Sequence, residues 1–306
     1  MNRKQLRYSL LLTLTAFIWG TAFVAQSQAT GNVGPFTFNA ARLLVGGAAL
    51  LPCIRLMDRF RGGGAAPGSR RTLLTGGVCC GVVLFAASAF QQAGIQYTTV
   101  GKAGFITALY IVAVPLAGAL FGRKTGAALW AGVALAVAGM YLLCISGESG
   151  VNRGDALCLA GALFFTAHIL VIDRFSPLVD GVRMSAVQFF VGGALSLLAM
   201  LLFEKPDWHG VLAAWFPILY AGILSSAVGY TLQIIAQKQV NPTLASLVMS
   251  LESVFSALAG WVILGQRLSA RELTGCALMF AAIVLAQIPK KADGQRVAGA
   301  PRAGRG

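Results

Sequence analysis

Ten apolar blocks dominate this sequence of 306 residues, and each is long enough to cross a lipid bilayer. A membrane-spanning helix needs roughly 20 apolar residues. The blocks lie near residues 9–29, 36–57, 72–92, 99–121, 127–145, 155–174, 183–203, 211–236, 243–264 and 271–288. Only 11% of the residues are charged, against about 25% in a soluble domain. The sequence therefore predicts an all-α integral membrane protein with ten transmembrane helices.

The first block follows Arg3, Lys4 and Arg7, a pattern that also begins secretory signal peptides. Nine further spans favour a retained first helix after a short N-terminal segment, residues 1–8. The six cysteines all fall inside predicted spans and lack the spacing of a disulfide framework or a zinc site. We therefore expect no metal and no other cofactor.

The basic residues indicate an orientation in the membrane rather than a nucleic-acid partner. If the N-terminus is cytoplasmic, eighteen of the 24 Lys and Arg residues fall in cytoplasmic segments and four in outer loops. The remaining two, Arg42 and Lys102, lie within or at the edge of spans. This asymmetry follows the positive-inside rule and predicts that both termini are cytoplasmic. The basic tail, residues 289–306, has no hydrophobic periodicity and is predicted to be disordered.

The two halves of the sequence share an order of features. An offset of 143 residues aligns Gly122 with Gly265, Lys124 with Arg267, and Gly132 with Gly275. Each half contains five spans, and an odd number means that the second half enters the membrane from the opposite side. The sequence predicts two inverted five-helix repeats, residues 9–146 and 154–288. Inverted repeats are typical of transporters, with the binding site near mid-membrane where the repeats meet.

Three runs carry a family resemblance: FIWGTAFVAQ (17–26), FQQAGIQYTTVGKAGFITALYIVAVPLAG (90–118) and QKQVNPTLASLVMSLESVFSALAGWVILGQRLS (237–269). They resemble the EamA family of the drug/metabolite transporter superfamily, over about residues 9 to 288. The resemblance implies ten helices in two inverted repeats with both termini cytoplasmic. It also implies export of amino acids, related metabolites or toxic compounds across a bacterial inner membrane, and it names no particular solute.

The sequence departs from the family pattern at two positions of the second half. Ser253 stands where the family often has a proline, and Gln266 where it often has a glutamate. The missing proline favours a straighter ninth helix. The missing glutamate removes a charge from an outer loop.

Ionisable residues inside a membrane are costly and often functional, and three are candidates here. Glu252, in the ninth span, is a candidate proton-coupling or amine-binding carboxylate, or a structural hydrogen-bond partner. Lys102 either binds a substrate carboxylate or extends to the outer interface. His168 is either a proton switch or a link between two helices. Arg42 is expected to be structural, pairing with carbonyls or an interfacial carboxylate.

Polar and aromatic residues at helical spacing on several spans predict a shared aqueous cavity. In the eighth span, Ser226, Tyr230, Gln233 and Gln237 share one face at 100° per residue. Together with the ionisable candidates, the predicted cavity residues are Trp19, Gln91, Gln92, Lys102, Tyr110, His168, Tyr230, Gln233 and Glu252. Any single amide can instead bond to a neighbouring backbone group.

These features predict a secondary transporter that exports a small metabolite, such as an amino acid or a derivative, by alternating access. The sequence lacks GxxxxGK[ST], so ATP is not the direct driver; proton coupling and facilitated diffusion both remain open. Broad-specificity drug efflux, metabolite uptake and a channel are the alternatives. An intramembrane enzyme is disfavoured because HExxH, GxSxG and paired aspartates are absent, so no catalytic residue is expected. The oligomeric state stays open.

Overall fold

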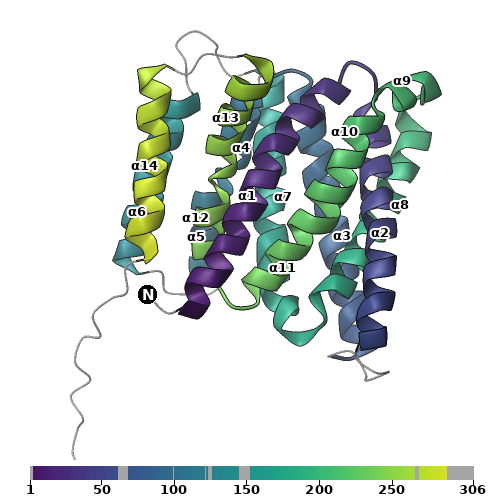
Figure 1. Ribbon diagram of the computed structural model, residues 1–306, viewed down its shortest axis with the longest axis horizontal. Helices are drawn as coiled ribbons and strands as arrows, with labels where there is room; N and C mark the ends of the chain where they lie inside the picture. Colours follow the sequence, from purple (N-terminus) through teal and green to yellow (C-terminus); the bar gives the residue numbers. More distant parts are fainter. Residues whose placement is uncertain are drawn as a thin grey trace, which may run out of the picture.

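The computed structural model describes residues 3–60, 68–98, 100–120, 122, 126–144, 152–265 and 269–287. These residues form helices joined by short turns, and the described part contains no strand (Figure 1). The predicted all-helical class is confirmed. The predicted disordered tail and Gln266 lie outside the described residues, and the first helix already covers most of the predicted N-terminal segment.

The first half of the chain contains six helices. They are α1 (Arg3–Ala29), α2 (Pro35–Phe60), α3 (Arg70–Ile95), α4 (Val100–Thr107), α5 (Tyr110–Leu120) and α6 (Ala127–Cys144). The predicted fourth span is thus divided into α4 and α5.

The second half repeats this order with more divisions. Its helices are α7 (Arg153–Phe175), the 3-10 turn η1 (Ser176–Leu178), α8 (Gly181–Phe203), α9 (Trp208–Ala213), α10 (Trp215–Leu219), the π-helix η2 (Tyr220–Tyr230), α11 (Thr231–Gln237), α12 (Pro242–Met249), α13 (Glu252–Leu264) and α14 (Ala270–Gln287). The predicted eighth span is therefore α10, η2 and α11, with a π-helical centre.

Helix breaks recur at equivalent places in the two halves. The break between α4 and α5 falls at Ala108–Leu109, and that between α12 and α13 at Ser250–Leu251, 142 residues later. At the first break, the Leu109 amide donates to the Ile106 carbonyl at 3.2 Å and the Ile111 amide to the Ala108 carbonyl at 3.0 Å. These are the short i to i−3 hydrogen bonds of a 3-10 turn.

The second break has the same pattern: Leu251 donates to Val248 at 3.2 Å and Ser253 to Ser250 at 3.1 Å. After the first break α5 contains Pro115, whereas α13, which follows the second break, has no proline. The expectation of a straighter ninth helix is therefore wrong. A 3-10 turn interrupts this span whether or not a proline follows it.

Glycines that the sequence aligns also match in conformation. Gly122 follows α5 with φ +75°, and Gly265 follows α13 with φ +67°. These left-handed values are the usual C-terminal stop of a helix, which glycine adopts without steric penalty. The match extends the correspondence of the two halves to the turns before α6 and α14.

Polar caps fix where several helices begin. At α7, the Asp155 amide donates to Asn152 Oδ1 and the Asn152 amide donates to Asp155 Oδ2, both at 3.0 Å. This reciprocal pair is a capping box. Glu204, just after α8, caps the start of α2, because its two carboxylate oxygens accept from the Phe36 and Thr37 amides, each at 2.8 Å. The carboxylate thereby joins two helices of different halves.

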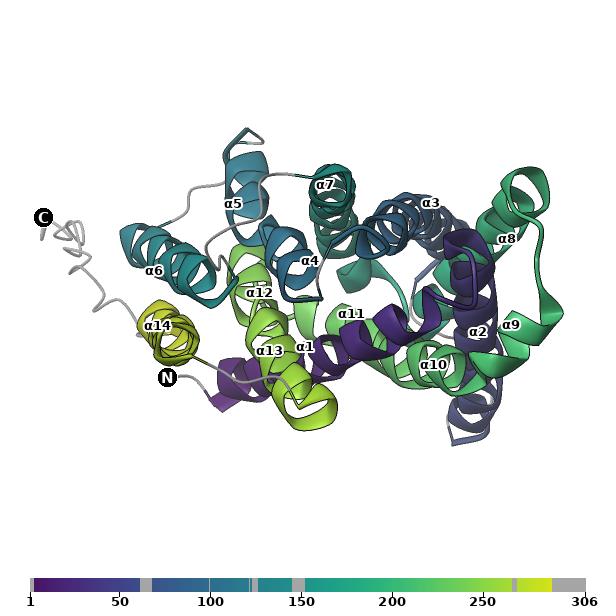
Figure 2. The same cartoon turned by 90° about the horizontal axis from the view of Figure 1, so that it is seen from above.

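The two halves interlock along the bundle. α3 packs on α7 and α8, α2 packs on α8, and α1 packs on α13 and η2. Seen from above, α6 and α14 lie together at one side, with α2, α8 and α9 at the other (Figure 2). The middle of the bundle, around α1, α4, α7 and α13, is therefore built by both halves.

The bundle has two ends, which we name by the chain. The N-terminal end carries the start of α1, the end of α2, the start of α8 and the end of α11, and lies at the bottom of Figure 1. The far end carries the end of α1, the end of α3 and the start of α7. Thus α1 leaves the N-terminal end, whereas its counterpart α7 starts at the far end.

Eight helical segments of the described chain are long and apolar enough to cross a membrane. They are Gln5–Ala29, Pro35–Phe60, Arg70–Ile95, Val100–Leu120, Arg153–Leu178, Gly181–Phe203, Trp215–Gln237 and Pro242–Ile263. Two shorter apolar helices, Ala127–Leu142 and Leu273–Leu285, belong to α6 and α14. The multi-pass class is confirmed, and the total of ten spans stays a prediction.

Candidate functional site

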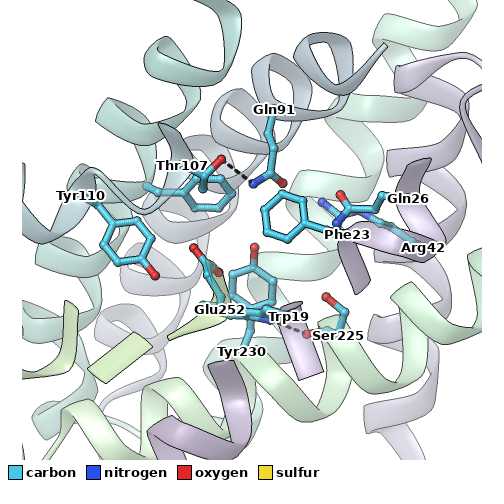
Figure 3. A pocket seen from close by; sticks show the side chains of 11 residues that line it. Trp19, Phe23, Gln26, Arg42, Gln91, Thr107, Tyr110, Ser225, Tyr230 and Glu252 are labelled. Carbon is cyan, nitrogen blue, oxygen red and sulfur yellow. Dashed lines mark hydrogen bonds between the residues drawn. The ribbon is translucent and has the colours of Figure 1, made fainter. Parts of the chain in front are cut away.

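A polar cavity lies where the two halves meet, and the space in it that a water-sized molecule can occupy is about 30 Å³. This space holds about two water molecules, so a larger solute fits only when the lining side chains move apart. Its lining comes from helices of both halves: Trp19, Phe23, Gln26, Arg42, Gln91, Thr107, Tyr110, Phe165, Ser225, Tyr230 and Glu252. Figure 3 shows these side chains around one space, with Arg42 and Glu252 on opposite sides of it.

The helix breaks deliver two facing side chains to the cavity. Tyr110 is the first residue of α5 and Glu252 the first of α13, so they occupy equivalent positions 142 residues apart. The phenol of Tyr110 points toward the Glu252 carboxylate (Figure 3). A carboxylate at a helix N-terminus is favoured by the helix dipole. The repeat therefore places a phenol from one half opposite a carboxylate from the other.

Arg42 contributes a buried positive charge to the opposite wall. Arg42 is 2% exposed, and its Nε donates to Asn39 Oδ1 at 2.8 Å. Asn39 in turn donates to the Ser88 carbonyl at 3.0 Å. Because α2 presents Asn39 and Arg42 three residues apart, one helical turn holds both groups.

Aromatic rings form the wall between these charges. The Tyr230 ring lies 4.7 Å from the Trp19 ring, centroid to centroid, and His168 packs on it at 5.6 Å. Trp19 is fixed because its Nε1 donates to the Ser225 carbonyl at 3.1 Å. Rings anchored in this way give the cavity a rigid surface that suits the apolar part of a small solute.

Gln91 and Thr107 form the polar wall of the first half. The Gln91 amide nitrogen donates to Thr107 Oγ1 at 3.2 Å, which leaves the amide oxygen directed elsewhere. Gln26, on α1, also lines the cavity, and its Oε1 has no hydrogen-bond partner among the described residues. The cavity thus offers amide oxygen acceptors beside its two charged groups.

Of the nine predicted cavity residues, the structure brings five together. Trp19, Gln91, Tyr110, Tyr230 and Glu252 line the same space. Their role in binding a solute stays a prediction.

The other four predicted residues lie outside this lining. Lys102 Nζ donates to Asp155 Oδ2 at 2.8 Å near the far end. His168 Nε2 is hydrogen-bonded to Gln188 Oε1 at 3.0 Å. Gln92 donates to the Gln26 carbonyl at 3.4 Å. Each of these three hydrogen bonds links two helices. Gln233 is buried, with 1% of its surface exposed.

Sequence reasoning gave no cavity role to five of the lining residues, namely Phe23, Arg42, Thr107, Phe165 and Ser225. Gln26 shares a helical face with Trp19, and this polar face was one of those that predicted the cavity. Ser225 lines the cavity while Ser226 does not, because η2 is a π-helix. Its hydrogen bonds run to i+5, so a wheel of 100° per residue assigns the wrong face.

Within the described ranges, no three His, Cys, Asp or Glu side chains gather in a way that could hold a metal ion. The polar groups of the cavity are amides, hydroxyls, one guanidinium and one carboxyl group.

Two matching halves of membrane helices around a buried polar cavity are the architecture of a membrane transport protein. The model of the EamA-like transporter family matches residues 6–145 and 152–287. The chain belongs to this family, as the resemblance predicted.

Several relatives carry transporter names. An uncharacterized transporter of Archaeoglobus fulgidus is 29% identical over 290 residues, which cover 93% of this chain and 87% of the relative. The uncharacterized transporter YwfM of Bacillus subtilis is 28% identical, with 93% and 95% covered. The uncharacterized inner membrane transporter YedA of Escherichia coli is 25% identical, with 89% and 88% covered.

One solved crystal structure has the same fold. It superposes with a TM-score of 0.77 at 21% sequence identity, and the match covers 94% of this chain and 99% of the other. At this identity the likeness concerns the fold alone.

Proposed function

We propose that this protein is a secondary transporter of the bacterial inner membrane, which exports a small metabolite such as an amino acid or a derivative. Transport proceeds by alternating access, in which the two halves rock around the central cavity. The transporter class follows from the family; the membrane, the solute and the direction are our proposal.

The observation that carries the proposal is the pair of opposite charges across one buried cavity. Arg42 and Glu252 both line it, from α2 and α13, which belong to different halves. A solute with one anionic and one cationic group satisfies both without adding net charge to the site. Rocking of the halves changes the distance between the two groups and thereby the affinity.

The membrane topology is part of the same proposal. With α6 and α14 counted as spans, the chain has ten transmembrane helices in two inverted repeats, residues 9–146 and 154–288. Each of these two helices has 18 residues, which corresponds to about 27 Å at 1.5 Å per residue. The N-terminal end and both termini are then cytoplasmic, in line with the distribution of basic residues. The inner-membrane relative of Escherichia coli supports this location.

Two other transport functions compete with this one. The aromatic wall formed by Trp19, Phe23 and Tyr230 also suits an apolar cation, which is the substrate type of broad drug efflux. The same cavity serves an uptake carrier if the driving gradient is reversed. Glu252 allows proton coupling in either direction.

Counterflow in proteoliposomes tests the proposal. Vesicles loaded with one unlabelled amino acid at a time should accumulate the labelled form through the wild-type protein, saturably and for a narrow set of solutes. The Glu252→Gln variant should lower the rate about 10-fold or more, since hydrogen bonds to charged groups have this effect on binding. Asp173→Asn, on α7, is the matched control, because Asp173 does not line the cavity.

A folded wild-type protein that carries no amino acid contradicts the amino-acid proposal. Transport of unrelated apolar cations in the same vesicles favours drug efflux. A proton gradient imposed across the vesicles then decides the coupling, because a proton-coupled carrier responds to its direction.

A further inference from the structure

We infer that Arg42 is the anion-binding residue of the cavity and that the solute presents a single carboxylate to it. The inference rests on the proposed transport function in one respect only, that the bound solute is the transported one. Arg42 was expected to be structural from the sequence, and Lys102 was a candidate for binding a carboxylate. The geometry reverses these two roles.

The charge of Arg42 has no acidic partner in the described structure. Among the described residues, Lys102 forms an ion pair with Asp155 and Arg183 with Asp58, and neither pair involves Arg42. A guanidinium stays protonated in a protein, and a buried charge is strongly unfavourable unless it is paired. The free energy that this unpaired charge costs the empty protein is recovered when an anion binds.

The guanidinium is held so that part of it faces the cavity. Its Nε is occupied by Asn39 Oδ1, and its Cζ lies 5.9 Å from the centroid of the Phe38 ring. Its Nη2 is buried and has no hydrogen-bond partner among the residues that the structure describes. Figure 3 shows Arg42 at the edge of the cavity, opposite Glu252. Such a fixed, planar donor suits the two oxygens of a carboxylate.

The charges of the cavity select a monoanion over a dianion. Among the described residues that line the cavity, Arg42 is the one basic side chain and Glu252 the one acidic side chain. A phosphate dianion would bring two negative charges to one guanidinium, with a carboxylate across the same space. A carboxylate brings one, so the positive charge is matched and Glu252 remains available to a donor group of the solute.

Lys102 lacks this geometry. Its ammonium donates to Asp155 Oδ2, and the Thr98 hydroxyl donates to Asp155 Oδ1 at 2.6 Å. Lys102 does not line the cavity. Because the Lys102 ammonium is already paired with the Asp155 carboxylate, it does not need an anionic group of the solute as a partner.

The test uses Trp19 as a reporter in the cavity. A variant that keeps Trp19 and replaces Trp130, Trp208, Trp215 and Trp261 with Phe is reconstituted into nanodiscs; none of the four lines the cavity. Its emission is titrated with matched pairs that differ only in the acid group. These are acetate and acetamide, benzoate and benzamide, and each amino acid with its primary amide. Inorganic phosphate is the dianion probe.

We expect at least one carboxylate to change the Trp19 emission saturably, and its amide to bind about 10- to 100-fold more weakly, as expected for loss of a hydrogen bond to a charged group. Arg42→Gln should abolish this preference and Arg42→Lys should keep part of it. Arg55→Gln is the matched control, since Arg55 is an exposed residue of the same helix. Phosphate should bind more weakly than the best carboxylate.

Equal affinity for acid and amide in the protein with Arg42 present overturns the inference, as does the absence of any saturable response. So does an acid preference that persists in Arg42→Gln. If Arg42→Gln fails to fold, the acid–amide comparison with Arg42 intact and the Arg42→Lys variant still decide. Stronger binding of phosphate also contradicts the inference.

The outcome for Arg42 is separable from the outcome for transport. Carboxylates that bind at Trp19 without counterflow leave the inference standing and remove the proposed transport of that solute. Counterflow of solutes that lack an acid group would support transport and contradict the role of Arg42 as the anion-binding residue.

Discussion

At the far end, Asp155 on α7 joins α4 and the turn between α3 and α4 through hydrogen bonds. It accepts from Lys102 and Thr98 and completes the cap of α7. The sequence marked Lys102 as a membrane ionisable residue but gave no sign of this partner, because the two residues are 53 positions apart. The packing of α4 against α7 determines that Lys102 pairs with Asp155, and neither local sequence shows it.

At this scale we expect Asp155→Asn to destabilise the protein by about 1–3 kcal/mol, since the partly buried Lys102 ammonium then loses a hydrogen-bonded charge. The melting temperature in detergent measures the change. Lys102→Gln should also lower it. Lys205→Gln, at an exposed position of the same end, should not. A melting temperature unchanged in both Asp155→Asn and Lys102→Gln would show that the ion pair contributes no stability.

A second prediction at the residue scale concerns the glycines where α3 meets α7. A Cβ at Gly94 would lie 2.8 Å from the Gly154 carbonyl oxygen, closer than van der Waals contact allows. Gly94→Ala should therefore cost about 1–3 kcal/mol through overpacking. Gly101→Ala is its control, because nothing lies within 4 Å of a Cβ there. The Gly101 change should be neutral or slightly stabilising, and equal melting temperatures for the two variants would contradict the close packing.

Among the elements, the two broken helices decide the site. Their apolar composition predicted spans, but neither break was predicted, since Ala108 and Ser250 carry no strong turn signal. Helix propensity alone favours continuation at both places, and packing in the bundle overrides it. The π-helix η2 is a similar case: its residues fit an α-helical pattern, and only contact with α1 and α2 shows which serine reaches the cavity.

This view of the elements predicts that Pro115 does not cause the first break. Pro115→Ala should leave the protein folded, with a melting temperature equal to or above that of the wild type, because alanine restores a backbone donor inside α5. Counterflow through the Pro115→Ala variant, compared with the wild type, reports whether the break still directs Tyr110 into the cavity. Loss of folding in this variant would assign the break to the proline.

For the whole molecule, the matching halves place the cavity toward the far end. Gln26, Arg42 and Gln91 all lie in the far-end halves of α1, α2 and α3. Toward the N-terminal end, Leu12, Leu244 and Leu247 belong to one buried apolar cluster. The sequence predicted the repeat and a shared cavity. The end of the bundle toward which the cavity lies depends on where the helices pack tightly together, which only the structure shows.

The proposed topology predicts opposite labelling of the two ends. In a cysteine-free background, a membrane-impermeant maleimide added to intact spheroplasts should modify Lys205→Cys at the far end. Lys238→Cys, exposed at the N-terminal end, should react only after lysis. The reverse pattern would invert the orientation, and labelling of both from outside would refute a chain that crosses the membrane as proposed.

The sequence by itself determined the class: apolar blocks of bilayer length require membrane helices, the repeat requires two halves, and the quoted runs identify the family. Five of the nine predicted cavity residues lie together because polar side chains in apolar spans avoid the lipid and face the interior of the bundle. Only the tertiary structure decided that Arg42 lines the cavity and that Lys102 pairs with Asp155. The reason is that burial and charge pairing depend on helices distant in sequence, and that breaks and π-turns change the face a residue presents.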